Sequence, residues 1–168
     1  MKRRPLAKGG ALFRLDPMDE ATFVAWREAT KREYAAEKVK AGNYPESGAV
    51  EMAEAEFVNL LPDGRLTTGH EIRSMVNDDG EKVGYAWFTI ESRDVGRVVY
   101  IYDIGVEPAH RRQGYARLAL AEIDAYARDH DCIGVMLHVF GDNEAARRLY
   151  ASAGYLETNV IMLKRVDG

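Results

Sequence analysis

Three runs of strand-forming residues follow one another between positions 70 and 106, and they limit the possible folds more than any other feature. They are HEIRSMV (70–76), VGYAWFTI (83–90) and RVVYIYDIGV (97–106). NDDG (77–80) is typical of a tight turn, so the first two runs should form a hairpin. SRDVG (92–96) links the second run to the third. We therefore expect an antiparallel sheet in the middle of the chain.

Helical patterns flank this sheet on both sides. Before it, hydrophobic spacing predicts a first strand at 11–15 and helices over 19–40 and 47–60. After it, the patterns predict a helix over 114–130, a strand over 133–139, a helix over 143–154 and a final strand over 155–165. This order favours a mixed α/β fold with helices packed on a largely antiparallel sheet. We expect a single domain over 1–168, with residues 1–10 as a flexible tail.

Composition narrows the class of protein. The chain has 168 residues, 46% of them hydrophobic, which is enough for a real core. The net charge of -4 argues against nucleic acid as the main partner. No apolar run approaches a membrane span, and MKRRPLAK at the start is not followed by the apolar segment of a secretory signal. Cys132 is the only cysteine, so no internal disulfide can form. We expect a cytoplasmic protein with neither nucleic acid nor membrane as partner.

The stretch RRQGYA (111–116) connects the third strand run to the next helix. The first amides of a helix lack internal acceptors and carry the positive end of the helix dipole, so they bind phosphate well. Gly114 and Ala116 remove side-chain bulk, and Arg111, Arg112 and Arg117 add positive charge. A pyrophosphate is the ligand that this arrangement favours. Taken alone, the stretch is also consistent with a simple glycine turn flanked by solvated arginines.

Two other kinds of phosphate loop do not fit this stretch. The Walker pattern requires Lys followed by Ser or Thr, and neither follows here. The dinucleotide-binding pattern requires G-x-G-x-x-G at the start of a βαβ unit, which is also missing.

Two blocks in the second half of the chain resemble the GNAT N-acetyltransferase superfamily. The first is V-x-P-x-x-R-R-x-G-x-A, which begins at Val106, and the second is N-E-A-A-R-R-L-Y-x-x-x-G-Y, which begins at Asn143. The resemblance covers about 98–163, and the element order of the whole chain is compatible with it. Ala116 stands where the family often has glycine, and alanine is an accepted small substitute. The resemblance implies a GNAT-like acyl-CoA N-acyltransferase fold, with a twisted, mostly antiparallel sheet and a splayed strand pair.

The resemblance also implies a site for acetyl-CoA. In the family, the strand before the loop pairs through its backbone with the pantetheine arm, and by position that role falls to Ile104, Gly105 and Val106. The pyrophosphate would lie on the loop and the helix start, at Arg111, Arg112, Gln113, Gly114, Tyr115, Ala116 and Arg117. Asn143 would contact the cofactor arm, although it is equally suited to be the N-cap of the last helix, with Asp142 as the rival cap.

Tyr150 matches the family's tyrosine that protonates the departing CoA thiolate. A phenol held near the sulfur can donate a proton as the C–S bond breaks. The structural alternative is that Tyr150 packs on the core beside Leu149. Cys132 is not placed by the motif to act as a nucleophile, so the amine should attack the thioester directly.

The reaction also needs a base, because an amine of this kind is mostly charged near pH 7. Asp103 is an acid inside an otherwise apolar strand, and His138 lies at the position where some relatives carry an acidic base. A histidine titrates near working pH and suits the task. Both have structural alternatives, a salt-bridged acid for Asp103 and a sheet-face histidine for His138. Glu91 is a weaker third candidate.

The sequence thus predicts an acetyl-CoA-dependent N-acetyltransferase whose acceptor is a primary amine on a small molecule, a peptide or a protein. The alternatives are a non-catalytic acyl-CoA-binding sensor or regulatory module, and a donor longer than acetyl. Acidic residues of the 19–60 arm could attract a cationic amine, although a solvated face explains them too. Aromatic residues of the strands, such as Tyr85 and Trp87, are expected in packing or along an acceptor pocket. We expect no metal, because the histidines lack metal-ligand spacing, and a homodimer is possible.

Overall fold

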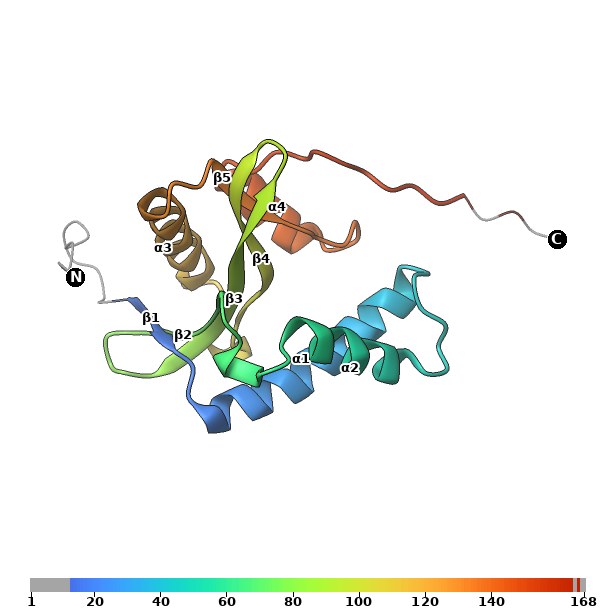
Figure 1. Cartoon of the computed structure of the whole chain (residues 1–168), viewed down its shortest axis with the longest axis horizontal. Helices are drawn as coiled ribbons and strands as arrows, with labels where there is room; N and C mark the ends of the chain where they lie inside the picture. The colour runs from blue at the N-terminus through green and yellow to red at the C-terminus, as the bar shows by residue number, and fades with distance from the viewer. Residues whose placement is uncertain (1–12, 165, 167–168) are drawn as a thin grey trace. The chain divides into compact units, whose positions relative to one another are not determined.

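The computed structural model describes residues 13–164 and 166, and within them the chain divides into two compact units. The first unit ends at His138 and the second begins at Val139 (Figure 1). The flexible tail expected at 1–10 lies outside the described residues. The expectation of a single domain over 1–168 stays a prediction.

The first unit is built around a sheet that has five strands among the described residues, in the order β1-β2-β3-β4-β5. The neighbours from β1 to β4 pair antiparallel, whereas β4 and β5 pair parallel. The prediction of a largely antiparallel sheet is confirmed. The strands are β1 (Arg14–Pro17), β2 (His70–Val76), β3 (Lys82–Arg93), β4 (Gly96–Val106) and β5 (Gly134–Leu137).

Two helices of the first half of the chain cover one face of this sheet, α1 (Glu20–Lys40) and α2 (Ala49–Leu60) (Figure 1). Asp19 begins α1 by accepting a hydrogen bond from the amide of Thr22 at 3.0 Å, which supplies one amide of the first turn with an acceptor. A short 3-10 helix, Gly64–Leu66, follows α2. The core on this face is aromatic and includes Phe23, Trp26, Phe57, Ile72 and Trp87.

Polar contacts join the two arm helices to each other. The carboxylate of Glu54 on α2 pairs with Arg27 at 2.5 Å and with Lys31 at 2.8 Å, both from α1. Glu56 accepts a hydrogen bond from the hydroxyl of Tyr34 at 2.7 Å. These contacts fix α1 against α2, so the two helices of the 19–60 arm form a helical hairpin that is joined by polar side chains.

The opposite face of the sheet is covered by α3 (Tyr115–Asp129), which follows the 3-10 helix Pro108–His110. Ala119, Leu120, Ile123 and Ala127 form its buried stripe, at the spacing that an amphipathic helix requires. The ring of Phe88 on β3 meets Tyr126 of α3 edge-on, with ring centroids 5.1 Å apart. The first unit therefore has three layers, with the sheet in the middle.

The second unit holds α4 (Glu144–Ser152). The strand predicted over 155–165 is wrong for the residues that can be judged, because 155–164 have neither strand nor helix geometry. The segment has the strand-forming composition that suggested it, but a strand exists only where another strand pairs with it. Composition does not supply that partner.

Candidate active site

The parallel strands β4 and β5 separate part of the way along β4. Their ladder joins Val98–Ile101 to Gly134–Leu137 and goes no further, while β4 continues to Val106. On its other side β4 stays paired with β3 as far as Val106. The last part of β4, residues 102–106, therefore has one backbone edge outside the ladder with β5. The splayed strand pair is present, and Ile104, Gly105 and Val106 lie on its open edge.

A bulge in β4 turns Asp103 toward α1. Trp87 on β3 pairs with Asp103, but the next residue, Phe88, pairs with Ile101, so Tyr102 is an extra residue in β4. Without the extra residue, the alternation of a strand would place Tyr102 and Asp103 on opposite faces. Here both reach the α1 face, since Tyr102 stacks on Trp87 at 4.6 Å and Asp103 contacts α1.

Helix α1 holds the carboxylate of Asp103 through two donors. The indole N–H of Trp26 donates to Oδ2 at 3.2 Å, and the hydroxyl of Thr30 donates to the same oxygen at 3.1 Å. Burial raises the pKa of the Asp103 carboxyl to about 6, and the negative charge of Glu33 adds to this, while the two hydrogen bonds lower it. Asp103 is therefore a carboxyl group that titrates close to neutral pH.

A cavity of about 380 Å³ lies between α1 and the ends of β3 and β4, and Asp103 itself is not among the residues that line it. Trp26 and Thr30 line it, so the donors to Asp103 are also part of its wall. Tyr85 also lines the cavity, and burial raises the pKa of its phenol. The full lining is Met18, Thr22, Ala25, Trp26, Ala29, Thr30, Glu33, Lys82, Gly84, Tyr85, Val106, Glu107, Pro108 and Arg111.

The loop from Arg111 to Gly114 has two left-handed residues just before α3. Arg112 and Gly114 both adopt left-handed conformations, with φ of 65° and 90°. Such residues turn successive amides to one side of the chain and make a concave site for an anion. Gly114 is the N-cap of α3, and no side chain caps that end of the helix. The side chains of Arg111, Arg112 and Arg117 are exposed around it.

The other predicted bases lie in different surroundings. His138 is exposed and comes one residue after β5 ends, so it lies beside the start of the splay. Glu91 on β3 pairs with Arg93 and accepts a hydrogen bond from the hydroxyl of Tyr102 at 3.1 Å. These partners give Glu91 a structural role.

The second unit carries the two remaining candidates. The side chain of Asn143 accepts a hydrogen bond from the amide of Ala146 at 3.1 Å, so Asn143 and not Asp142 is the N-cap of α4. Tyr150 lies on α4, and its ring centroid is 5.6 Å from that of Tyr155.

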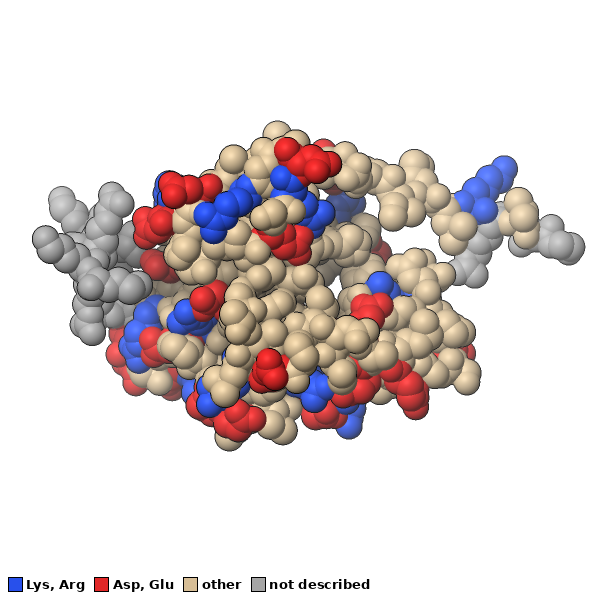
Figure 2. All heavy atoms as spheres, in the orientation of Figure 1, with Lys and Arg blue, Asp and Glu red and all other residues tan. Residues whose placement is uncertain are grey.

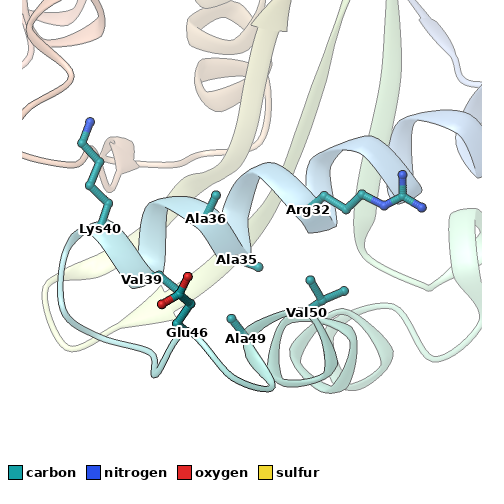
Figure 3. Close-up of a pocket in the computed structure, with 8 residues that line it drawn as sticks. All are labelled: Arg32, Ala35, Ala36, Val39, Lys40, Glu46, Ala49 and Val50. Carbon is teal, nitrogen blue, oxygen red and sulfur yellow. The ribbon is translucent and has the colours of Figure 1, made fainter.

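A second cavity, of about 400 Å³, lies between the end of α1 and the start of α2 (Figure 3). Its walls are mostly small apolar side chains, including Ala35, Val39 and Ala49. In Figure 3 the side chain of Arg32 extends along α1, away from Ala49, and Lys40 points away from α2. The described residues place no base beside it comparable to Asp103, so it is a weaker candidate for the reaction site.

Sequence reasoning missed Trp26 and Thr30 as site residues. The available signal was Thr30 itself, a polar residue in line with the buried positions Phe23 and Trp26 on α1. Of the arm's acidic residues, Glu33 lines the 380 Å³ cavity near Asp103, whereas Glu54 and Glu56 join α1 to α2.

The described part of the chain lacks two features that would point to other functions. No helix there is long and apolar enough to cross a membrane. No group of three or more His, Cys, Asp or Glu side chains gathers there in a way that could hold a metal ion. Figure 2 shows acidic and basic side chains interspersed over the face of the first unit that it presents.

The chain belongs to the acetyltransferase (GNAT) family, whose model matches residues 23–155. Membership in this family indicates an acyltransferase, and acetyl transfer is its general reaction. The fold described above, with the splayed strands and the loop before α3, agrees with this assignment.

Two proteins of Bacillus subtilis, both named as uncharacterized N-acetyltransferases, are similar over almost their whole length. YycN is 36% identical over 152 residues, which are 90% of this chain and 97% of YycN. YdgE is 34% identical over 154 residues, which are 92% of this chain and 98% of YdgE. The crystal structure of YycN matches with a TM-score of 0.86 at 35% identity, over 93% of this chain and 99% of that one.

A more distant solved structure shares the fold. It is the aminoglycoside N-acetyltransferase AAC(6')-Iy in complex with CoA, which matches with a TM-score of 0.61 at 17% identity. The match covers 96% of this chain and 99% of that one.

Proposed function

We propose that this protein transfers the acetyl group of acetyl-CoA to a primary amine, and that the amine reacts at the cavity beside α1. The observation that carries the proposal is Asp103, a carboxyl group with a pKa of about 6 that is held beside this cavity at the point where β4 leaves β5. Acid–base catalysis is most efficient when the pKa lies near the working pH.

The donor is proposed to lie along the open edge of β4 and on the loop before α3. Backbone groups of Ile104, Gly105 and Val106 would pair with the pantetheine arm as an added strand does. The pyrophosphate would accept hydrogen bonds from the amides of residues 112–117, aided by the left-handed Arg112 and Gly114. The CoA complex of AAC(6')-Iy, which shares this fold, supports CoA as the carrier.

Asp103 is the proposed general base. Because its pKa is about 6, the carboxyl group is mostly ionised at pH 7 and can take a proton from the amine, directly or through one water molecule. The neutral nitrogen then attacks the thioester carbon and the C–N bond forms. The nitrogen gives up its second proton to solvent as the C–S bond breaks, which leaves the amide and the CoA thiolate. His138 is the alternative base, and its exposed position gives it less shelter from solvent.

Tyr150 is the proposed general acid, whose phenol would give its proton to the departing thiolate. Tyr150→Phe should lower kcat by about 100-fold, the lower end of what a positioned acid contributes, while the Kd for acetyl-CoA changes little. Tyr155→Phe is the matched control, since it removes a hydroxyl from the neighbouring ring of the same unit. Equal kcat values for the two variants would show that Tyr150 is not the acid.

The acceptor is proposed to be a cationic amine, on a small molecule, a peptide or a protein. Glu33 on the cavity wall and Asp103 beside it would attract positive charge. AAC(6')-Iy, which shares this fold, is named for an aminoglycoside acceptor, and this supports the proposal of an amine acceptor.

Thermal-shift titration is the first test of the proposal, with acetyl-CoA, free CoA and longer acyl-CoAs as separate ligands. A ligand that binds the native state raises the melting temperature with its concentration. Release of free thiol from acetyl-CoA is then measured over a panel of amines. A shift together with amine-dependent thiol release supports an enzyme. Binding without thiol release for any amine supports the sensor module, and the absence of any shift contradicts the donor site.

A further inference from the structure

Two side chains of α1 contact both the proposed acceptor cavity and the proposed base. Trp26 and Thr30 are four residues apart, so they lie on the same face of the helix, one turn from each other. Both side chains are buried, with 6% and 9% of their surfaces exposed. Both line the cavity and both donate to Oδ2 of Asp103.

This pair of contacts is unusual for a stripe that otherwise packs the core. Phe23 belongs to the same stripe and packs in the apolar core, with its ring centroid 5.6 Å from that of Trp26. A threonine at this buried position has to satisfy its hydroxyl group, and the carboxylate 73 positions away in the sequence does so. The bulge at Tyr102 is what brings that carboxylate to the α1 face.

We propose that Trp26 and Thr30 are positioning residues that hold the Asp103 carboxylate directly behind the cavity wall that they form, so that α1 sets the orientation of the base. The inference rests on the proposed function of Asp103. With two donors on one oxygen, rotation of the carboxyl group would break both hydrogen bonds. The backbone amide of Ile104, the next residue in the strand, also favours the ionised carboxylate and lowers the pKa of Asp103.

The same donors also set the pH at which the base works. Burial favours the neutral acid, whereas hydrogen bonds to the carboxylate favour the ionised form that can accept a proton. Loss of one donor should therefore raise the pKa of Asp103 and move the acidic limb of the rate profile to higher pH. The titratable and charged groups that face Asp103 or line the same cavity are Glu33 on α1, Lys82 and Tyr85 on β3, and Glu107 and Arg111 after β4.

The test compares Thr30→Val, which removes the hydroxyl but keeps the shape, with Thr30→Ser, which keeps the hydroxyl. The carboxyl carbon of Asp103 is titrated by 13C NMR in protein labelled at aspartate, and Asp103→Asn identifies its signal. We expect the midpoint in Thr30→Val to rise by about one pH unit, the typical strength of a hydrogen bond to a charged group. Thr30→Ser should return it to the wild-type value.

Rate measurements show whether this shift matters for the reaction. With the amine identified by the panel above, kcat/KM is measured from pH 5 to pH 9. The acidic limb in Thr30→Val should move by the same amount as the NMR midpoint, and kcat should fall about tenfold as the carboxylate loses its fixed orientation. Thr22→Val is the matched control, because Thr22 lines the same cavity on α1 but bonds to Asp19 and Lys82. The acidic limb of the Thr22→Val rate profile should stay at the wild-type pH.

The outcomes separate this inference from the proposed function. If Asp103→Asn retains the acidic limb, Asp103 is not the base, and both proposals fail. If Asp103→Asn removes the limb but Thr30→Val moves neither the NMR midpoint nor the rate profile, the base is correct and the positioning role is wrong. Trp26→Phe tests the second donor independently and should shift the midpoint in the same direction, even if Thr30→Val does not fold.

Discussion

The loop at 111–114 and the cavity beside α1 use different parts of the polypeptide. The loop presents backbone amides, and its shape depends on two residues in left-handed conformations, Arg112 and Gly114. The cavity presents side chains. The carboxyl group of Asp103 lies behind two of them, Trp26 and Thr30, which donate to it from a helix 77 and 73 positions earlier in the sequence. A donor's phosphates need the first kind of site, and proton transfer from an amine needs the second.

This difference determines how each region should respond to mutation. A loop that works through its backbone tolerates many side chains but fails when a side chain occupies the space of the ligand. A cavity that works through buried side chains is sensitive to single hydrogen bonds and to the packing that holds them. Mutations can therefore test the two regions separately.

The largest effect is expected for Gly114→Glu in the loop. A Cβ at Gly114 would meet no atom within 4 Å, so the new side chain fits, but its carboxylate would repel the pyrophosphate. The Kd for acetyl-CoA, measured by isothermal titration calorimetry, should rise by roughly 1,000-fold. In free energy this is several times the effect of one charge at a helix end, because the new side chain also blocks access to the amides.

The control for this variant is Gly80→Glu in the turn between β2 and β3. Gly80 has φ of 81° and an equally open surrounding, so both variants carry the same left-handed strain and the same added charge. Gly80→Glu should bind acetyl-CoA as the wild type does. Equal losses of affinity in the two variants would mean that strain or charge alone is responsible. The loop could then no longer be assigned as the pyrophosphate site.

A smaller effect, on stability, is expected for Asp103→Asn in the cavity. Burial raises the pKa of Asp103 from 3.8 to about 6, so its contribution to stability is fully present below pH 3.8 and is lost as pH rises through 6. Asparagine does not ionise, so the variant avoids this loss. The difference in unfolding free energy should grow in favour of the variant by up to roughly 3 kcal/mol between pH 3.5 and pH 7.

Urea unfolding at several pH values measures this difference, with the value at pH 3.5 as the internal reference. A difference that does not change with pH would show that Asp103 titrates as an exposed aspartate does. The cavity would then lose the property that distinguishes its carboxyl group, although the loop would be unaffected.

The two regions also differ in how much of them could be predicted from the sequence. The loop is visible in the sequence as a local pattern, because Gly114 and the arginines are close together and precede a predicted helix. The structure places them at the start of α3. The boundaries of α1 and α3 were predicted within one residue, since caps and helical periodicity are local too. Asp103 could be noticed as an acid in an apolar strand.

The partners of Asp103 could not be predicted in the same way. Trp26 and Thr30 reach it only because a bulge at Tyr102 changes which face of β4 the carboxyl group occupies. A bulge is decided by the pairing of two strands, and strand pairing is not visible in the periodicity of either strand. The strand predicted over 155–165 was wrong over 155–164 for a similar reason, because composition suggested a strand without supplying its neighbour.

The smallest effect is expected for Gly105→Ala on β4. This variant tests whether the cavity depends on side-chain packing, as the loop depends on backbone conformation. Gly105 pairs with Tyr85 across the sheet, and a Cβ on Gly105 would lie 2.5 Å from Cζ of the Tyr85 ring. The ring would have to move from its place beside Trp26, so the free energy of unfolding should fall by about 1–3 kcal/mol, as in other overpacked cores. Gly134→Ala on β5 is the matched control, because a Cβ there meets nothing within 4 Å.

The double variant Gly105→Ala with Tyr85→Leu shows whether the ring is the cause. If the clash with the ring is responsible, the alanine should be less costly when the ring is absent, and the two changes will not be additive. Unfolding in urea gives all four free energies of the cycle. Additive costs, or a Gly134→Ala variant as unstable as Gly105→Ala, would mean that the glycine serves the backbone of β4 and not the contact with Tyr85. Gly105 would then be needed for its backbone conformation, as Gly114 is in the loop. The end of β4 would no longer differ from the loop in this respect.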